Sequence, residues 1–474
     1  MSSVIRPTGT GEEWKSMDAH SAQYRPDDAL LARSKASIER HRKRDVTLRL
    51  LDRMGRPLAH RPVQVVQQSS SFPVGEQLWG FDTLHRFGQW NTDRGRYARL
   101  RFTELFNAAN ALCYWTERSR NDGPKTEDLQ GEPTLEGFAA CVDWAKSEGM
   151  IVKGHPLFWS IQKCIPEWVK RYDYATQLKF AEVRIRNLVA RFKGKVSLWD
   201  AVNEAMWEPA FKNLAQRNWP HIDPIAEIAD YIEPILRWCR QEDPDAEFLL
   251  NDYGLEKDPE PGAPVAGAPA SEAGSPVTAA RQRQRFLALT RELQQRGSPP
   301  SALGLQSHTG GWLDHSSQLA VYDEMATGNV PLHVTEFWAD IDHLKQQGLP
   351  EDHIVEMQAE YVCNYLTVAF GHPAIEGFFF WGLFSAAVEF GEHSSHELRP
   401  LYHRLRKLLR EEWRTNQNLV TDAEGQIRFR GFLGRYSLRY EVAPGSTSEQ
   451  AGITFDVDAC GSMPQNLCAP MSAF

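Results

Sequence analysis

Short apolar runs alternate with amphipathic stretches through the central part of the chain. The apolar runs have the length and the flanking turn residues that are typical of buried strands. They comprise residues 78–83, 106–114, 150–159, 196–204, 247–253, 302–308, 332–340 and 375–384. Between them, residues 178–192, 225–239 and 354–368 place apolar side chains at helical spacing. Strands that alternate with helices in this way predict a (β/α)8 barrel over residues 78–416.

The two ends of the chain have a different pattern. Residues 1–44 are polar and charged, and we expect a leader that packs on the surface or is partly mobile. Residues 45–77 contain two strand-like runs around a Gly/Pro break, which predicts a β-hairpin segment. Residues 417–474 also contain short alternating strands, so the two ends could pair into one small accessory β module.

One stretch interrupts the alternation after the fifth predicted strand. Residues 256–277 are rich in proline, alanine and glycine and cannot build a core. We expect a long loop there. Loops that follow barrel strands lie on the active face, so this loop either rims the site or is simply mobile.

Composition narrows the range of partners. The 474 residues carry 53 Lys+Arg against 62 Asp+Glu, a formal net charge of −9, which makes nucleic acid and anionic membranes poor partners. The N-terminus has no signal-peptide pattern and no long apolar window occurs, so we expect a cytoplasmic protein. Seven sparse cysteines favour free thiols, and a bridge between Cys460 and Cys468 stays open.

The predicted strands share a second property, since most of them begin apolar and end in polar or aromatic residues. In a barrel, the C-terminal ends of the strands carry the functional side chains. The residues expected at this rim are His155, Trp159, Asn203, Glu204, Asn251, Asp252, Gln306, His308, Glu336 and Trp381. Two carboxyl groups across one mouth suit cleavage of a glycosidic bond, and Glu204 and Glu336 form that pair. A salt bridge to a loop arginine is the structural alternative for either glutamate.

Six segments, in this order, resemble glycoside hydrolase family 10, the family of (β/α)8 β-1,4-xylanases. They are GHPLFW, WDAVNE, NDY, GLQSH, VTE and FWG, and the resemblance covers roughly residues 46–415. It implies a retaining mechanism in which Glu204 is the general acid/base and Glu336 is the nucleophile. It also implies that Asn203 holds the 2-hydroxyl of the sugar at the cleavage point.

The same resemblance implies roles for the neighbouring residues. His308 would orient the nucleophile, with Gln306 beside it. His155 would contact a hydroxyl of the sugar, and Trp159 and Trp381 would wall the same subsite. Core packing is the alternative for these histidines and tryptophans.

The chain also departs from the family pattern. Family xylanases carry Glu-Asn-x-Met-Lys-Trp on strand two, whose Glu and Lys help bind the next sugar. Here the strand reads Ala109-Asn110-Ala111-Leu112-Cys113-Tyr114-Trp115, in which only Asn110 keeps its place as a substrate-binding residue. Trp-Gly-x-Thr-Asp after strand eight becomes Trp381-Gly382-Leu383-Phe384-Ser385, and Glu336 is followed by Phe337-Trp338. The distal subsites are therefore expected to be rebuilt.

The leading hypothesis is a retaining β-glycosidase, xylanase-like in mechanism, that acts on a β-linked xylo-oligosaccharide or a related glycoside. It needs no metal and no cofactor. One alternative is a hydrolase of plant glycosides with a bulky apolar aglycone, resembling tomatinases, with Phe337, Trp338 and Phe384 as the wall. Another is a carbohydrate-binding barrel without catalytic activity.

Overall fold

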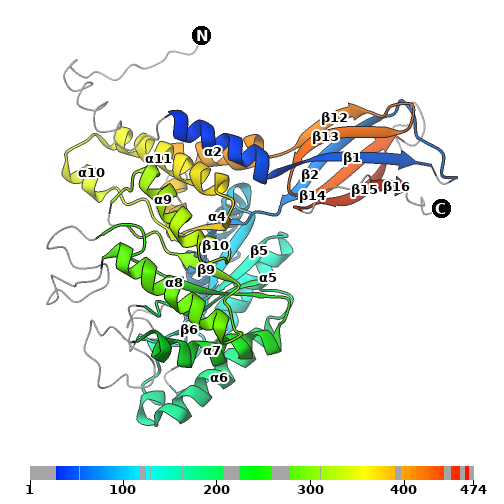
Figure 1. The fold of residues 1–474 in the computed structure, drawn as a ribbon. Helices are drawn as coiled ribbons and strands as arrows, with labels where there is room; N and C mark the ends of the chain where they lie inside the picture. Colours follow the sequence, from blue (N-terminus) through cyan, green and yellow to red (C-terminus); the bar gives the residue numbers. More distant parts are fainter. Residues whose placement is uncertain are drawn as a thin grey trace.

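A barrel of parallel strands carries a smaller β module that projects from one end (Figure 1). The computed structural model describes residues 28–52, 54–116, 124–128, 130–161, 164–206, 224–258, 278–309, 311–389, 397–441, 450–459 and 465–468. Within these ranges the barrel strands follow one another around the ring, and the ring closes through pairing of β5 with β7. The predicted (β/α)8 barrel with an accessory β module is confirmed.

The barrel strands are short and almost fully buried, as parallel strands covered on both faces must be. They are β3 (Val74–Gln77), β4 (Ala108–Leu112), β5 (Ile151–His155), β7 (Leu198–Asn203), β8 (Glu247–Asp252), β9 (Ala302–Leu305), β10 (Leu332–Phe337) and β11 (Ile375–Phe380). A two-residue strand, β6 (Phe158–Trp159), extends the edge of β7.

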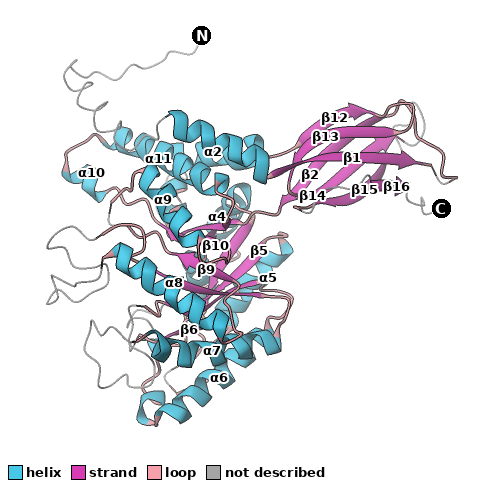
Figure 2. Ribbon diagram, in the orientation of Figure 1, coloured by secondary structure: helices cyan, strands magenta, loops and turns pink. Residues whose placement is uncertain are grey.

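Figure 2 shows helices around the barrel strands. They are α3 (Trp79–Arg86), α4 (Asp93–Leu105), α5 (Glu136–Ser147), α6 (Tyr174–Arg191), α7 (Ile225–Glu242), α8 (Ala279–Gln295), α9 (His315–Ala326), α10 (Asp342–Gln346), α11 (Glu351–Gly371), α12 (Phe384–Ala387) and α13 (Pro400–Lys407). Their apolar faces and the outward side chains of the strands make one continuous core.

The first barrel strand differs from the prediction. Residues 78–83 were expected to form it, but Trp79–Arg86 is helix α3, in which Phe81 and Leu84 are buried one helical turn apart. The strand is the preceding run, Val74–Gln77, and it is too short for a pattern to reveal. Gly75 permits its close pairing, because a Cβ there would lie 2.7 Å from the carbonyl oxygen of Ala108 on β4.

The β module is a pair of sheets built from both ends of the chain. Its strands are β1 (Lys43–Leu51), β2 (Pro62–Ser70), β12 (Asn416–Val420), β13 (Gln426–Phe432), β14 (Gly434–Glu441), β15 (Gln450–Val457) and β16 (Gln465–Cys468). One sheet has the order β13-β1-β16 and the other has the order β12-β2-β14-β15. Alternate apolar side chains from both sheets share one core.

The hairpin predicted over residues 45–77 is wrong as a pairing. An isolated bridge joins Leu51 at the end of β1 to Pro57, which precedes β2, and the two strands lie in different sheets. Each strand forms hydrogen bonds with C-terminal strands instead: β1 pairs with β13, and β2 pairs with β12 and β14. A sequence shows which segments are strands, but partners this far apart leave no local signal.

Part of the polar leader is ordered against the barrel. Residues 28–41 form helix α2 (Asp28–His41), which buries Leu30, Ser34 and Ile38 at four-residue spacing and packs on α11. The following Arg42 donates to the backbone carbonyls of Phe370 and His372, both at 2.8 Å. Residues 1–27, most of the 256–277 loop and Cys460 lie outside the described residues.

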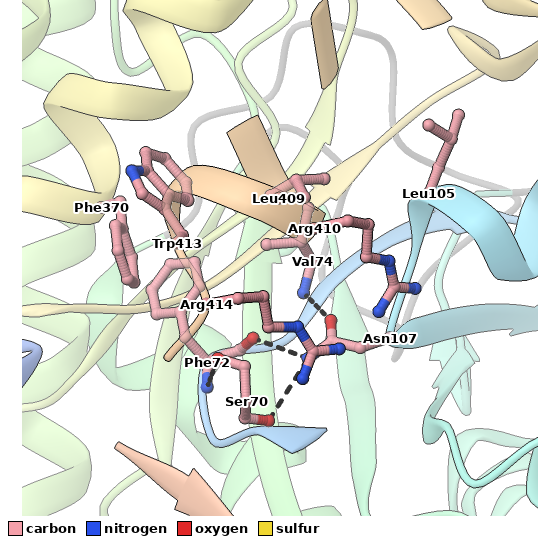
Figure 3. Close-up of a pocket in the computed structure, with 10 residues that line it drawn as sticks. All are labelled: Ser70, Phe72, Val74, Leu105, Asn107, Phe370, Leu409, Arg410, Trp413 and Arg414. Atoms are coloured by element: carbon pink, nitrogen blue, oxygen red, sulfur yellow. Dashed lines mark hydrogen bonds between the residues drawn. The ribbon is translucent and has the colours of Figure 1, made fainter. Parts of the chain in front are cut away.

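A small cavity lies where the module meets the barrel (Figure 3). Its lining includes Asn107, whose side chain accepts from the Val74 N–H at 2.7 Å and donates to the Phe72 carbonyl at 2.9 Å. Asn107 therefore fixes the chain as it enters β3. The volume is about 20 Å³, room for roughly one water molecule, so this cavity is not a substrate site.

Candidate active site

The predicted rim residues gather at the C-terminal ends of the barrel strands. His155 and Asn203 are the last residues of β5 and β7, and Glu204 follows at once. Gln306 and His308 follow β9, Glu336 lies within the last two residues of β10, and Trp381 follows β11. Because parallel strands in a closed barrel end at one mouth, residues far apart in sequence face one space.

Glu336 is a buried carboxylate between two hydrogen-bond donors. Its side chain accepts from Asn251 Nδ2 at 2.7 Å and lies 3.0 Å from His308 Nε2. Burial alone would raise the pKa of Glu336, but the hydrogen bond from His308 and the charges of His155 and Lys153 hold this pKa below its ordinary value. Glu336 is thus kept ionised, and His308 must carry its proton on Nε2, because an ionised carboxylate only accepts.

Glu204 is partly exposed, and its backbone is unusual. Its φ of 57° is in the left-handed region that side-chain-bearing residues rarely adopt. The Glu204 N–H donates to the carbonyl of Asn251 at 2.7 Å, which helps hold this conformation. Gln306 Nε2 donates to Glu204 Oε1 at 3.0 Å. A strained backbone at a strand end that aims a carboxyl group is common at functional sites.

A single hydrogen-bond network joins the two glutamates. Asn251 Nδ2 donates both to Glu336 and to Asn203 Oδ1, each at 2.7 Å. Gln306 Nε2 lies 3.4 Å from the same Asn203 oxygen and bonds Glu204. The sequence places Asn251 at the rim but gives it no role, because only the fold shows that it bridges the pair.

The imidazole of His155 is oriented by the buried ion pair between Lys153 and Asp200. Its Nδ1 lies 2.7 Å from Asp200 Oδ2, and Lys153 Nζ lies 2.6 Å from the same oxygen. Burial alone would raise the pKa of Asp200, but Lys153 and His155 lower it. Since ionised Asp200 only accepts, His155 donates through Nδ1 and turns its Nε2 to other partners. Lys153 and Asp200 are not among the predicted site residues, because they lie in mid-strand, where apolar residues are expected.

The other side of the mouth is aromatic. The Trp381 ring lies 5.2 Å from the His155 ring, and Trp159 lies 5.9 Å from Tyr114. Trp79 approaches Tyr114 at 6.2 Å, and its backbone N–H donates to Gln77 Oε1 at 2.5 Å. Trp79 and Tyr114 were not among the predicted site residues. The pattern of residues 78–83 predicts a strand, whereas Trp79 is the first residue of helix α3.

Three residues singled out by the sequence stand apart from this network. Asn110 is fully buried in β4, and neither polar atom of its amide has a hydrogen-bond partner in the structure as described. Phe337 stacks on Tyr365 of α11 at 4.2 Å, and Phe384 packs on Phe102 at 5.4 Å. Both phenylalanines belong to the core, so the apolar wall expected from them is wrong.

Two further observations concern the described part of the chain. It contains no group of three or more histidine, cysteine, aspartate or glutamate side chains that could hold a metal ion. None of its helices combines the length and apolar character needed to cross a bilayer.

The fold and the cluster of carboxyl, amide and imidazole groups at the strand ends define a (β/α)8 barrel with a polar site at its mouth. A family model described as glycosyl hydrolase family 10 matches residues 121–264 and 276–388, which is more than half of the chain. The protein belongs to this family. Strands β3 and β4, with Trp79 and Tyr114, precede the matched range.

Individual relatives are distant. The anti-sigma-I factor RsgI6 of Acetivibrio thermocellus is 24% identical over 85% of this chain and 46% of its own length. Endo-1,4-beta-xylanase 1 of Arabidopsis thaliana is 23% identical over 91% of this chain and 39% of its own length. The chain thus spans less than half the length of these two relatives.

A solved structure supports the fold. Xylanase 10B from Thermotoga petrophila, in complex with xylobiose, superposes with a TM-score of 0.51 at 20% identity. The superposition covers 72% of this chain and 95% of that one. At this identity the likeness supports the barrel architecture alone.

Proposed function

We propose that the protein is a retaining β-glycoside hydrolase that cleaves a β-linked xylo-oligosaccharide or a related glycoside. The observation that carries this proposal is the pairing of a buried, ionised Glu336 with a partly exposed Glu204 through one shared network. A nucleophile must stay ionised, whereas a general acid must exchange protons with solvent. The two environments suit these two roles.

In the first step, Glu336 attacks the anomeric carbon while Glu204 protonates the glycosidic oxygen. The C–O bond breaks, the leaving group departs, and the sugar stays as an ester on Glu336. In the second step, Glu204, now ionised, takes a proton from water as that water attacks the anomeric carbon. The Glu336 carboxylate is released, and the two inversions give overall retention.

The surrounding side chains serve recognition. Asn203 holds the 2-hydroxyl of the sugar, and the Nε2 side of His155 contacts another hydroxyl. Trp159 and Trp381 wall the same subsite. Asn110 is the buried amide assigned to substrate binding, and Ala109 and Cys113 stand where family xylanases carry the charged residues that help bind the next sugar.

The stereochemical outcome tests this proposal. Retaining enzymes place their carboxyl groups about 5–5.5 Å apart, and inverting ones place them farther apart. Proton NMR of the first-formed sugar, taken before mutarotation, should show the β-anomer. An α-anomer would remove Glu336 from the nucleophile role and leave the barrel assignment untouched.

A role in binding without turnover is the second candidate. One relative that matches 85% of this chain is named as an anti-sigma factor and not as a hydrolase. A panel of chromogenic β-glycosides separates the two candidates. If oligosaccharides bind but no glycoside is hydrolysed by the wild-type protein, the binding role replaces the catalytic one.

A further inference from the structure

A buried carboxylate lies at the seam where the first and last barrel strands meet. Glu76 is 1% exposed and lies near the C-terminal end of β3, paired with Phe380 on β11 and with Ala109 on β4. It contacts neither of the proposed catalytic glutamates. Carboxylates are rarely buried to this extent unless they have partners.

The partners of Glu76 are backbone N–H groups: that of the adjacent Gln77 on β3, which donates to Oε1 at 3.0 Å, and two from the turn after β11. Its Oε1 accepts from Gly382 at 2.6 Å, and its Oε2 accepts from Phe384 at 2.9 Å. The two oxygens thus accept from two N–H groups of one short segment, so the Glu76 side chain ties this segment to β3. Gly382 has a φ of 85°, which a glycine adopts at little cost, so the chain can turn sharply here.

This turn determines where Trp381 points. Trp381 directly precedes Gly382, and its own N–H donates to the carbonyl of Phe337 on β10 at 3.0 Å. Its backbone is therefore fixed on one side by β10 and on the other side by Glu76 of β3. The ring then stands 5.2 Å from His155.

We propose that Glu76 is the positioning residue for Trp381, and that it sets sugar affinity at the barrel mouth by holding the turn from Gly382 to Phe384. The expected effect of Glu76 on substrate turnover rests on the proposed function. The expected effect of Glu76 on the position of the Trp381 ring does not. Glu76 itself touches no reacting atom.

The first test is a double-mutant cycle on hydrolysis of an aryl β-xylobioside by the full chain. Glu76→Gln keeps the shape of the side chain but sets an amide NH₂ against an N–H donor. We expect KM to rise about tenfold and kcat to change by less than about threefold. Trp381→Ala should show the same pattern, and adding Glu76→Gln to Trp381→Ala should cost almost nothing further. Full additivity, or a loss confined to kcat, would overturn the proposal.

Asp82→Asn is the matched control. Asp82 is another buried carboxylate, on α3, and its partner is Arg86 at 2.9 Å. Removing its charge tests whether any buried carboxylate near the barrel alters KM. We expect unchanged KM, and a tenfold rise equal to that of Glu76→Gln would mean that the effect is general destabilisation.

A second readout needs no activity. The indole N–H resonance of Trp381, assigned through Trp381→Phe, reports the position of this ring in the free protein. Glu76→Gln should shift or broaden it, and Asp82→Asn should leave it in place. If the wild type hydrolyses no glycoside, the proposed function fails and this resonance still decides the role of Glu76. An unmoved resonance in Glu76→Gln contradicts that role whatever the activity.

Discussion

The two halves of the barrel mouth are built on different chemistry. The half formed by β7, β8, β9 and β10 is polar, and its hydrogen bonds run without a break from Glu204 to Glu336. The half formed by β3, β4, β6 and the end of β11 presents the rings of Trp79, Tyr114, Trp159 and Trp381. The family match contains all of the first half but begins after β4. The family match thus covers the polar half completely but includes only Trp159 and Trp381 of the four aromatic residues.

The sharpest test of the polar half is to remove each glutamate in turn. Glu336→Ala should reduce kcat by on the order of 10⁵-fold on every substrate, because no glycosyl-enzyme can form. Glu204→Ala should spare the first step on substrates with good leaving groups, since these need little protonation. Steady-state rates on aryl glycosides of graded leaving-group acidity measure this difference.

Azide provides the control for that pair. With Glu204→Ala, azide should restore turnover and give a β-glycosyl azide, because it attacks the ester on Glu336 without base assistance. With Glu336→Ala, no such rescue through the intermediate is expected. An α-glycosyl azide from Glu204→Ala would show that the two roles are exchanged or misplaced.

The next prediction concerns the ionisation of Glu336. Because His308 holds the pKa of Glu336 below its ordinary value, His308→Ala should raise that pKa. The acidic limb of the pH profile of kcat/KM should then move to higher pH, and kcat/KM should fall on the order of 10²-fold. Gln306→Ala is the control, since Gln306 donates to Glu204 and should leave this limb in place. An acidic limb that stays fixed in His308→Ala would assign it to another group.

The aromatic half predicts a substrate preference. Ala109 and Cys113 offer a second sugar no charged group, and Tyr114 is only 1% exposed between Trp79 and Trp159. We expect weak activity on long xylan, and about a tenfold loss of kcat/KM on short glycosides in Trp381→Ala. Comparing xylan, aryl xylobiosides and xylotriosides, and glycosides with large apolar aglycones measures this preference.

Two results of these substrate measurements would contradict the expected preference of the aromatic half. Strong xylan hydrolysis that improves with chain length would mean that other residues have replaced the missing charged pair. Preference for a large apolar aglycone, reduced in Trp338→Ala, would favour the plant-glycoside alternative. Phe384→Ala does not test that alternative, since Phe384 packs in the core.

The sequence could predict which residues form the polar half of the mouth, but not the buried residues that hydrogen-bond to them. Four residues lie at the ends of strands whose apolar runs are long enough to recognise, so their shared location follows from barrel closure alone. They are Asn203, Glu204, His308 and Glu336. Lys153, Asp200 and Asn251 act through contacts between strands, and periodicity along the chain carries no information about such contacts. The same limit explains why β1 and β2 looked like a hairpin and why the four-residue β3 was missed.

The smallest expected effect concerns the stability cost of Glu76. Burial raises the pKa of Glu76 to about 7, although the N–H groups of Gly382 and Phe384 oppose the shift. Its reference value is 4.5, so the folded protein binds this proton more tightly than the unfolded chain does. Stability from this group is therefore fully present below pH 4.5 and is lost as the pH rises toward 7.

Glu76→Gln carries no such proton, so its melting temperature relative to wild type should increase across this interval, by on the order of 2 °C. Differential scanning calorimetry at several pH values measures the difference, and Asp82→Asn shows how far any buried carboxylate contributes. A difference that stays constant with pH would mean that Glu76 does not titrate in this range, and a difference that falls would mean that the ionised form is the more stable partner of the turn. If this difference increases with pH, Glu76 holds the turn beside Trp381 and lowers the stability of the folded protein at neutral pH. Groups at functional sites often have such a cost in stability.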